Sequence, residues 1–170
     1  MSTRSLSDRI EELEERLLSS EPLGLSHDIP FGVFVYPPGE EQRVWKEVNL
    51  LSIRLSNEGR ETEVVDLGAE MWRCFDAHPA GPDGLIQAER QGSELTDVIS
   101  EARKLLTGPR QDEPGPLERK VIERLQNISG ENGVGLLGRA GQLYPLYRTS
   151  ALLERLIGKI EPRTVLFYPG

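Results

Sequence analysis

The sequence has few of the residues that build covalent or metal-centred sites. It contains one cysteine, Cys74, and two histidines, His27 and His78. A single cysteine excludes an internal disulfide, and neither histidine stands at a spacing typical of metal ligands. Cys74, Asp76 and His78 fall within one short segment, which does not supply the separate positions that a catalytic triad needs. We therefore expect no metal, no cofactor and no enzyme activity.

Long apolar runs and common catalytic motifs are also missing. No segment approaches the roughly 18 apolar residues of a membrane-spanning helix, and acidic residues interrupt the first twenty positions, which argues against a signal peptide. The sequence has no G-x-S-x-G elbow, and the loop at 36–42 reads YPPGEEQ where a P-loop would need glycines and a lysine. These absences predict a cytoplasmic protein with no membrane contact, no nucleotide hydrolysis and no evident small-molecule substrate.

Positive charge is scarce except near the C-terminus. The net charge is −8 and the pI is near 4.9, which disfavours direct nucleic-acid binding because a phosphate backbone needs a basic surface. Residues 134–170 carry five basic and two acidic side chains, a net +3, whereas residues 1–133 carry 15 basic and 26 acidic side chains, a net −11. Any anion-binding face is therefore expected in the C-terminal segment.

The order of apolar segments predicts an α/β fold. With 170 residues, 37% of them hydrophobic and 28% charged, the chain suits one globular domain spanning 1–170. Apolar or β-branched runs predict strands, and 3.6-residue periodicity predicts helices between them. We expect an open, mostly parallel sheet of about four strands covered by helices, Rossmann-like or resembling a degenerate P-loop fold. The predicted strands are 31–36, expected to be buried, and 62–67, 134–138 and 164–168.

Helices are expected over 6–17, 44–55, 69–76, 95–105 and 117–128, and one more with Pro145 in its first turn. The turn-rich segments 78–84 and 107–116 are predicted to separate helices and not domains. The sequence stops directly after 164–168, which has the composition of a central strand. Domains usually continue with covering structure at this point, so we expect either a truncation or an edge that a partner completes.

Two glycine-rich segments are candidates for phosphate binding. Residues 133–138 (GVGLLG) match G-x-G-x-x-G, but the match falls inside a predicted strand, which favours close backbone packing over a nucleotide site. Gly138-Arg-Ala-Gly141 leads toward a predicted helix with Arg148 and is the second candidate. Trp45 and Trp72 are either partner anchors or core residues, and the core interpretation is favoured.

Several segments together resemble the BrxB family of BREX phage-defence systems. They are PFGVFVYPP at 30–38, VVDL at 64–67, GRAGQLYPLYR at 138–148, ALL at 151–153 and VLFYPG at 165–170. Leu146 stands where family members commonly have Phe, and Ser150 where they have His, which removes any role proposed for that histidine. The family's chains generally continue past the Tyr-Pro-Gly, in keeping with the truncation considered above.

The resemblance implies a core component of BREX, a bacterial system that methylates host DNA and blocks phage replication. It implies no established catalytic activity. It also implies association with the PglZ-type alkaline-phosphatase-superfamily protein and with other BREX components.

Two hypotheses follow for function. In the first, the chain is an adaptor that binds a partner through a sheet edge or the C-terminal strand ends, where open parallel sheets collect binding residues. The candidate partner-binding residues are Tyr36, Arg139, Tyr144, Arg148 and Tyr168. An equally weighted alternative is that these residues only order the loops. In the second hypothesis the chain is a degenerate nucleotide-binding or nucleotide-sensing domain without hydrolysis, using Gly138, Gly141 and Arg148.

Overall fold

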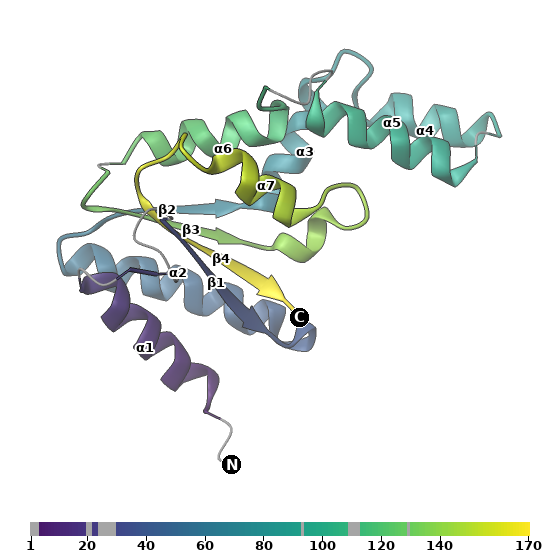
Figure 1. Cartoon of the computed structure of the whole chain (residues 1–170). Coiled ribbons are helices and arrows are strands. Elements are labelled where there is room, and N and C mark those ends of the chain that lie inside the picture. The colour runs from purple at the N-terminus through teal and green to yellow at the C-terminus, as the bar shows by residue number, and fades with distance from the viewer. Residues whose placement is uncertain (1–3, 20–21, 24–29, 93, 109–112, 129) are drawn as a thin grey trace.

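A computed structural model of the chain describes residues 4–19, 22–23, 30–92, 94–108, 113–128 and 130–170. It consists of a four-stranded parallel sheet with helices on both faces (Figure 1), which confirms the predicted α/β fold. The strands are β1 (Phe31–Tyr36), β2 (Glu61–Asp66), β3 (Gly133–Gly138) and β4 (Arg163–Pro169). The helices are α1 (Leu6–Leu18), α2 (Glu41–Asn57), α3 (Leu67–Ala77), α4 (Gly81–Arg90), α5 (Leu95–Thr107), α6 (Pro116–Gln126) and α7 (Thr149–Leu156), with short 3-10 helices η1 (Pro38–Glu40) and η2 (Ala140–Leu143).

The strand order is β1-β4-β3-β2, so the first two strands of the chain form opposite edges of the sheet. Helix α2 carries the chain from one edge to the other, and β3 and β4 then fill the middle. Strand β4 pairs with β1 from Phe31 opposite Thr164 to Tyr36 opposite Pro169. The predicted central position of 164–168 is confirmed. The prediction that 31–36 is a buried strand is wrong in part, because β1 is an edge strand whose Val33 and Val35 are 54% and 44% exposed.

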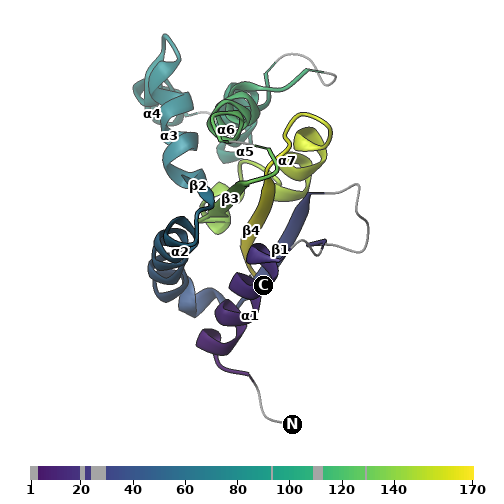
Figure 2. The same ribbon diagram turned by 90° about the vertical axis from the view of Figure 1, so that its left-hand side faces the viewer.

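The two faces of the sheet are covered unequally (Figure 2). Helices α1 and α2 cover one face, against Phe34, Val165 and Phe167. Helices α3, α6 and α7 lie over the other face, against Phe31 and Leu166 among others, and α5 packs on α3 and α6. Side chains of successive strand residues point to opposite faces, which is why both central strands are apolar along their length.

Two helical predictions differ from the structure. Helix α4, which packs on α5 away from the sheet (Figure 1), begins inside the segment 78–84 that was predicted to be a break. Its first turn holds Pro82, whose missing N–H is not needed there, and glycines on both sides of this proline conceal the helical pattern. Helix α7 begins at Thr149, so Pro145 lies before it, in a turn that follows a cis Tyr144–Pro145 peptide bond.

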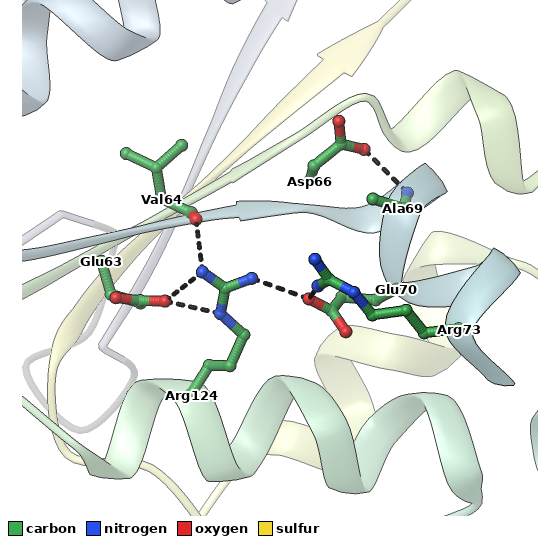
Figure 3. Close-up of polar contacts among 7 residues, drawn as sticks. All are labelled: Glu63, Val64, Asp66, Ala69, Glu70, Arg73 and Arg124. Atoms are coloured by element: carbon green, nitrogen blue, oxygen red, sulfur yellow. Dashed lines mark hydrogen bonds and ion pairs between the residues drawn. The ribbon is translucent and has the colours of Figure 1, made fainter. Parts of the chain in front are cut away.

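Buried charge on one edge of the sheet is neutralised by Arg124 of α6 (Figure 3). Its guanidinium donates to Glu63 of β2 at 2.5 Å and to Glu70 of α3 at 2.7 Å. It also donates to the backbone carbonyl of Val64 at 3.2 Å. The Glu70 carboxylate is almost fully buried and accepts a further bond from Arg73. One side chain therefore joins α6, β2 and α3.

Arginines also hold the end of α1. Arg163, at the start of β4, donates to the backbone carbonyls of Arg16, Leu17 and Ser19. Arg60 donates to that of Leu18 at 2.7 Å. Carbonyls in the last turn of a helix have no partner within the helix, so these guanidinium groups supply one and fix α1 to the sheet.

Replacing Arg124 should destabilise the protein. Arg124→Met removes hydrogen bonds to two carboxylates and leaves Glu70 buried with only Arg73 to compensate it. We expect a loss of about 1–3 kcal/mol in the free energy of unfolding, measured by urea denaturation. Arg119→Met, at an exposed position of the same helix, is the matched control and should change stability little. Equal losses in both variants would contradict this role, and Glu70→Gln should restore part of the loss in the Arg124→Met background.

Cys74 should be chemically inert in the folded protein. Its side chain is buried in the core, and burial raises the pKa of the thiol to about 11. Because only the thiolate reacts with disulfide reagents, almost none is available at pH 8. We expect the native protein to react at least tenfold more slowly with a chromogenic disulfide than the urea-unfolded chain. Equal rates would show that Cys74 is accessible.

Candidate partner-binding site

A pocket of about 590 Å³ opens where β1 and β4 end. Because parallel strands end at the same side of a sheet, their C-terminal residues and the loops that follow meet there. The strands contribute part of the lining, η2 and the loop after it contribute more, and the first turns of α7 complete it. We call this the strand-end pocket; its lining residues are Val33, Pro38, Ala140, Gly141, Tyr144, Tyr147, Arg148, Thr149, Ser150, Leu153, Leu166, Tyr168 and Pro169.

Exposed aromatic side chains mark this pocket. Tyr144 is 84% exposed and Tyr168 is 39% exposed, although both follow apolar segments. Tyrosine combines a large apolar ring with a polar tip, and it is enriched where proteins contact other proteins. Val33, also exposed, continues the apolar lining onto β1.

Tyr147 forms a rigid part of the wall. Its hydroxyl donates to the buried carboxylate of Glu118, which also accepts a hydrogen bond from the backbone N–H of Gly115. Burial, followed by the bond to Glu118, raises the pKa of Tyr147 well above its usual value. The ring is therefore an uncharged, fixed phenol at neutral pH. It ties the pocket to α6.

Arg148 supplies a positive charge at the pocket. It lies at the N-terminal boundary of α7 and its side chain is exposed. Within the part of the chain that the structure describes, no carboxylate pairs with it. An arginine in this position is available for an acidic group on another molecule.

The structure brings together four of the residues singled out in the sequence: Gly141, Tyr144, Arg148 and Tyr168. Tyr36 lies elsewhere. Its side chain is 1% exposed, faces α2, and donates to Glu41 at 2.5 Å. Burial, with this bond, raises the pKa of Tyr36. Its hydroxyl orders the start of α2 and does not reach the strand-end pocket.

Arg139 also lies outside the pocket, at the ends of β2 and β3. It adopts a left-handed backbone conformation with φ of 58°. Its guanidinium lies 5.1 Å from the ring centroid of Trp45, and its Nε lies 3.5 Å from a carboxylate oxygen of Asp66. Asp66 in turn accepts from the backbone N–H of Ala69 and begins α3. Arg139 thus orders a junction between β3, α2 and α3.

Gly135 and Gly138 are needed for close packing. As predicted, the G-x-G-x-x-G match lies within β3. A Cβ on Gly135 would stand 2.5 Å from Leu125, and a Cβ on Gly138 would stand 2.3 Å from the Trp45 ring. The segment after Gly138 enters the four-residue η2 before α7 is reached. These contacts explain the glycines without a ligand, and phosphate binding stays a prediction.

A second, smaller pocket was not predicted from the sequence. It has a volume of about 270 Å³ and lies among α3, α4 and α5, where Trp72 is 54% exposed and packs edge-on against Phe75. The core interpretation is therefore wrong for Trp72, whereas Trp45 is half-buried and packs against the core. The pocket was not predicted because α4, which forms part of its wall, begins inside the segment 78–84 that was predicted as a break.

The described residues contain no group of three or more histidine, cysteine or acidic side chains placed to hold a metal ion. None of their helices combines the length and the apolarity needed to cross a membrane.

Comparison with known proteins agrees with the resemblance in the sequence. A family model described as "BREX protein BrxB" matches residues 85–170, half of the chain, which include β3, β4, α7 and most of the strand-end pocket. A protein named BREX protein BrxB from Bacillus cereus (strain H3081.97) is 21% identical over 172 residues, which cover 98% of this chain and 85% of that relative. No solved structure matches the chain. The chain belongs to the BrxB family of BREX proteins.

Proposed function

We propose that this chain, a BREX defence component by its family, is a non-catalytic adaptor that binds the PglZ-type protein of its own system through the strand-end pocket. The observation that carries the proposal is the combination of Tyr144, Tyr168 and Arg148 around one apolar hollow. All three side chains are exposed, and none has a polar side-chain partner within the described residues.

The chemistry of the pocket favours binding over catalysis. Among the residues that the structure describes, its lining contains no histidine, cysteine, aspartate or glutamate. General acid–base catalysis needs a group that gains or loses a proton near neutral pH, and neither an arginine nor the buried phenol of Tyr147, whose pKa is raised, does so. The lining instead offers apolar area, phenol rings and one guanidinium, and tyrosine and arginine supply much of the binding energy at protein interfaces.

The choice of partner rests on family membership together with the chemistry of the pocket. A BREX component works beside the other proteins of its system, and the resemblance in the sequence implies the PglZ-type protein among them. Arg148 has no carboxylate partner among the described residues and would bind a carboxylate on that partner. The tyrosines would make apolar or aromatic contacts with it. An adaptor can also bind other BREX components, and these are further candidate partners of the chain.

Changes at the pocket should weaken this complex. We expect Arg148→Glu and Tyr144→Ala each to raise the Kd for the purified PglZ-type protein at least tenfold, because each removes an exposed contact and the first also reverses a charge. Isothermal titration calorimetry measures the change, and thermal unfolding checks that the variants remain folded. Arg119→Glu, on α6, is the control for added negative charge and should bind like the unmodified chain.

Two outcomes would count against the proposal. If the unmodified chain forms no complex in size-exclusion chromatography with light scattering, the adaptor function is wrong for this partner. If a complex forms but neither pocket variant weakens it, the partner uses another surface.

The nucleotide-binding hypothesis predicts that a nucleotide raises the melting temperature of the chain, whereas the adaptor hypothesis does not. A ligand that binds only the folded state raises the melting temperature, with about 2.7 kcal/mol of stabilisation at a hundredfold excess over Kd. Because Gly138 is packed against Trp45 and η2 is short, we expect no shift in the Tm with millimolar ATP or GTP, with or without Mg²⁺. A rise in the Tm that Arg148→Ala abolishes would support a nucleotide-binding domain instead.

A further inference from the structure

The two edges of the sheet are built differently. The exposed edge of β2 carries charged and polar side chains, and Arg124 occupies the outward carbonyl of Val64. Strand β1 has the sequence FGVFVY, with no charged residue, and two of its valines are exposed. Proteins normally protect edge strands with charges because an unprotected edge pairs with other chains. The β1 strand thus has no charged side chain of its own. Within the described residues, Arg9 of α1 donates to the Val35 carbonyl, and the outward groups of Val33 have no partner.

Backbone geometry identifies which groups of β1 are available. The carbonyls of Pro30 and Tyr36 accept hydrogen bonds from Thr164 and Gly170, so even-numbered residues direct their backbone toward β4. Odd-numbered residues direct theirs outward, as the bond from Arg9 to the Val35 carbonyl at 2.5 Å shows. The N–H and C=O of Val33 and the N–H of Val35 consequently face outward. No other group in the described ranges pairs with them.

The side chains on this edge are continuous with the strand-end pocket. Val33 and Val35 lie on the same face of the sheet as Leu166 and Tyr168, with which they are in register across the β1–β4 pair. Both valines are exposed, no helix of the described residues covers them, and Val33 belongs to the pocket lining. A segment that pairs with β1 would place every second side chain over these residues.

We propose that the partner binds by β-strand addition, with an extended segment pairing along the outer edge of β1 at Val33 and Val35. This inference rests on the proposed function and specifies its mode. The segment has apolar residues at alternate positions, which cover the valines, and a carboxylate that reaches Arg148. Only an extended backbone offers donors and acceptors in the alternation that the edge presents.

A second copy of this chain fits the edge less well. Each copy carries a net charge of −8, which opposes self-association. In addition, residues 31–39 contain no acidic side chain, so a second β1 would bring no carboxylate to Arg148. The complementary occupant is a different protein.

Amide hydrogen exchange of the ¹⁵N-labelled chain, alone and with the purified PglZ-type protein, tests the pairing without any substitution. The Val33 and Val35 N–H groups should exchange freely in the isolated chain and at least tenfold more slowly in the complex. If the complex forms and these two amides exchange as before, strand addition is wrong while the adaptor function stands. If no complex forms, the adaptor function fails and this inference fails with it.

A pair of variants separates backbone pairing from side-chain contact. Val33→Pro removes an outward N–H and also replaces the side chain and fixes φ, changes that an edge strand tolerates. It should raise the Kd at least tenfold while thermal unfolding shows an intact fold. Val33→Thr keeps the N–H and a similar shape, and should bind within threefold of the unmodified chain. Equal weakening by both would point to side-chain packing and overturn strand pairing. Dimers of the isolated chain in light scattering that Val33→Pro abolishes would assign the edge to self-association instead.

Discussion

The parallel direction of all four strands is the constraint on which the rest of the structure depends. It forces every connection to cross a face of the sheet, and the long crossing by α2 sends β2 to the far edge, so that β1 becomes the other edge. It also gathers the strand ends on one side, where the residues after β3 meet those after β4. The strand-end pocket and the exposed edge of β1 are both products of this single arrangement.

Positions of the strands could be predicted from the sequence, but their order could not. Central parallel strands are buried on both faces, so they form continuous apolar runs such as VGLLG and VLF. Strand β1 has the same composition, although it lies at an edge. Its neighbour β4 is about 130 residues away in the sequence, and no local pattern encodes that pairing. Composition predicted a buried strand because it does not distinguish a strand covered on both faces from one at an exposed edge.

The candidate site was partly predictable for a related reason. Tyr168 lies near the end of β4, and Tyr144 and Arg148 lie between the end of β3 and the start of α7. The ends of parallel strands lie on the same side of a sheet, so these residues were expected to be close. Tyr36 is the last residue of β1, but alternate residues of a strand point to opposite faces, and Tyr36 points toward α2. Which face α2 covers becomes known only from the structure. The pocket at Trp72 could be predicted only together with α4, and the Gly-Pro sequence at the start of α4 hides that helix in the sequence pattern.

The separation of β1 and β4 in the sequence has a consequence for biosynthesis. A ribosome releases residues 31–36 long before residues 163–169, so during translation β1 lacks β4, its neighbour in the sheet. Contacts between residues so far apart in the sequence form late and slowly. An apolar strand that is still unpaired can associate with other chains during that time. The nascent chain therefore depends on α1 and α2, synthesised on either side of β1, to shelter one face of that strand until the sheet closes.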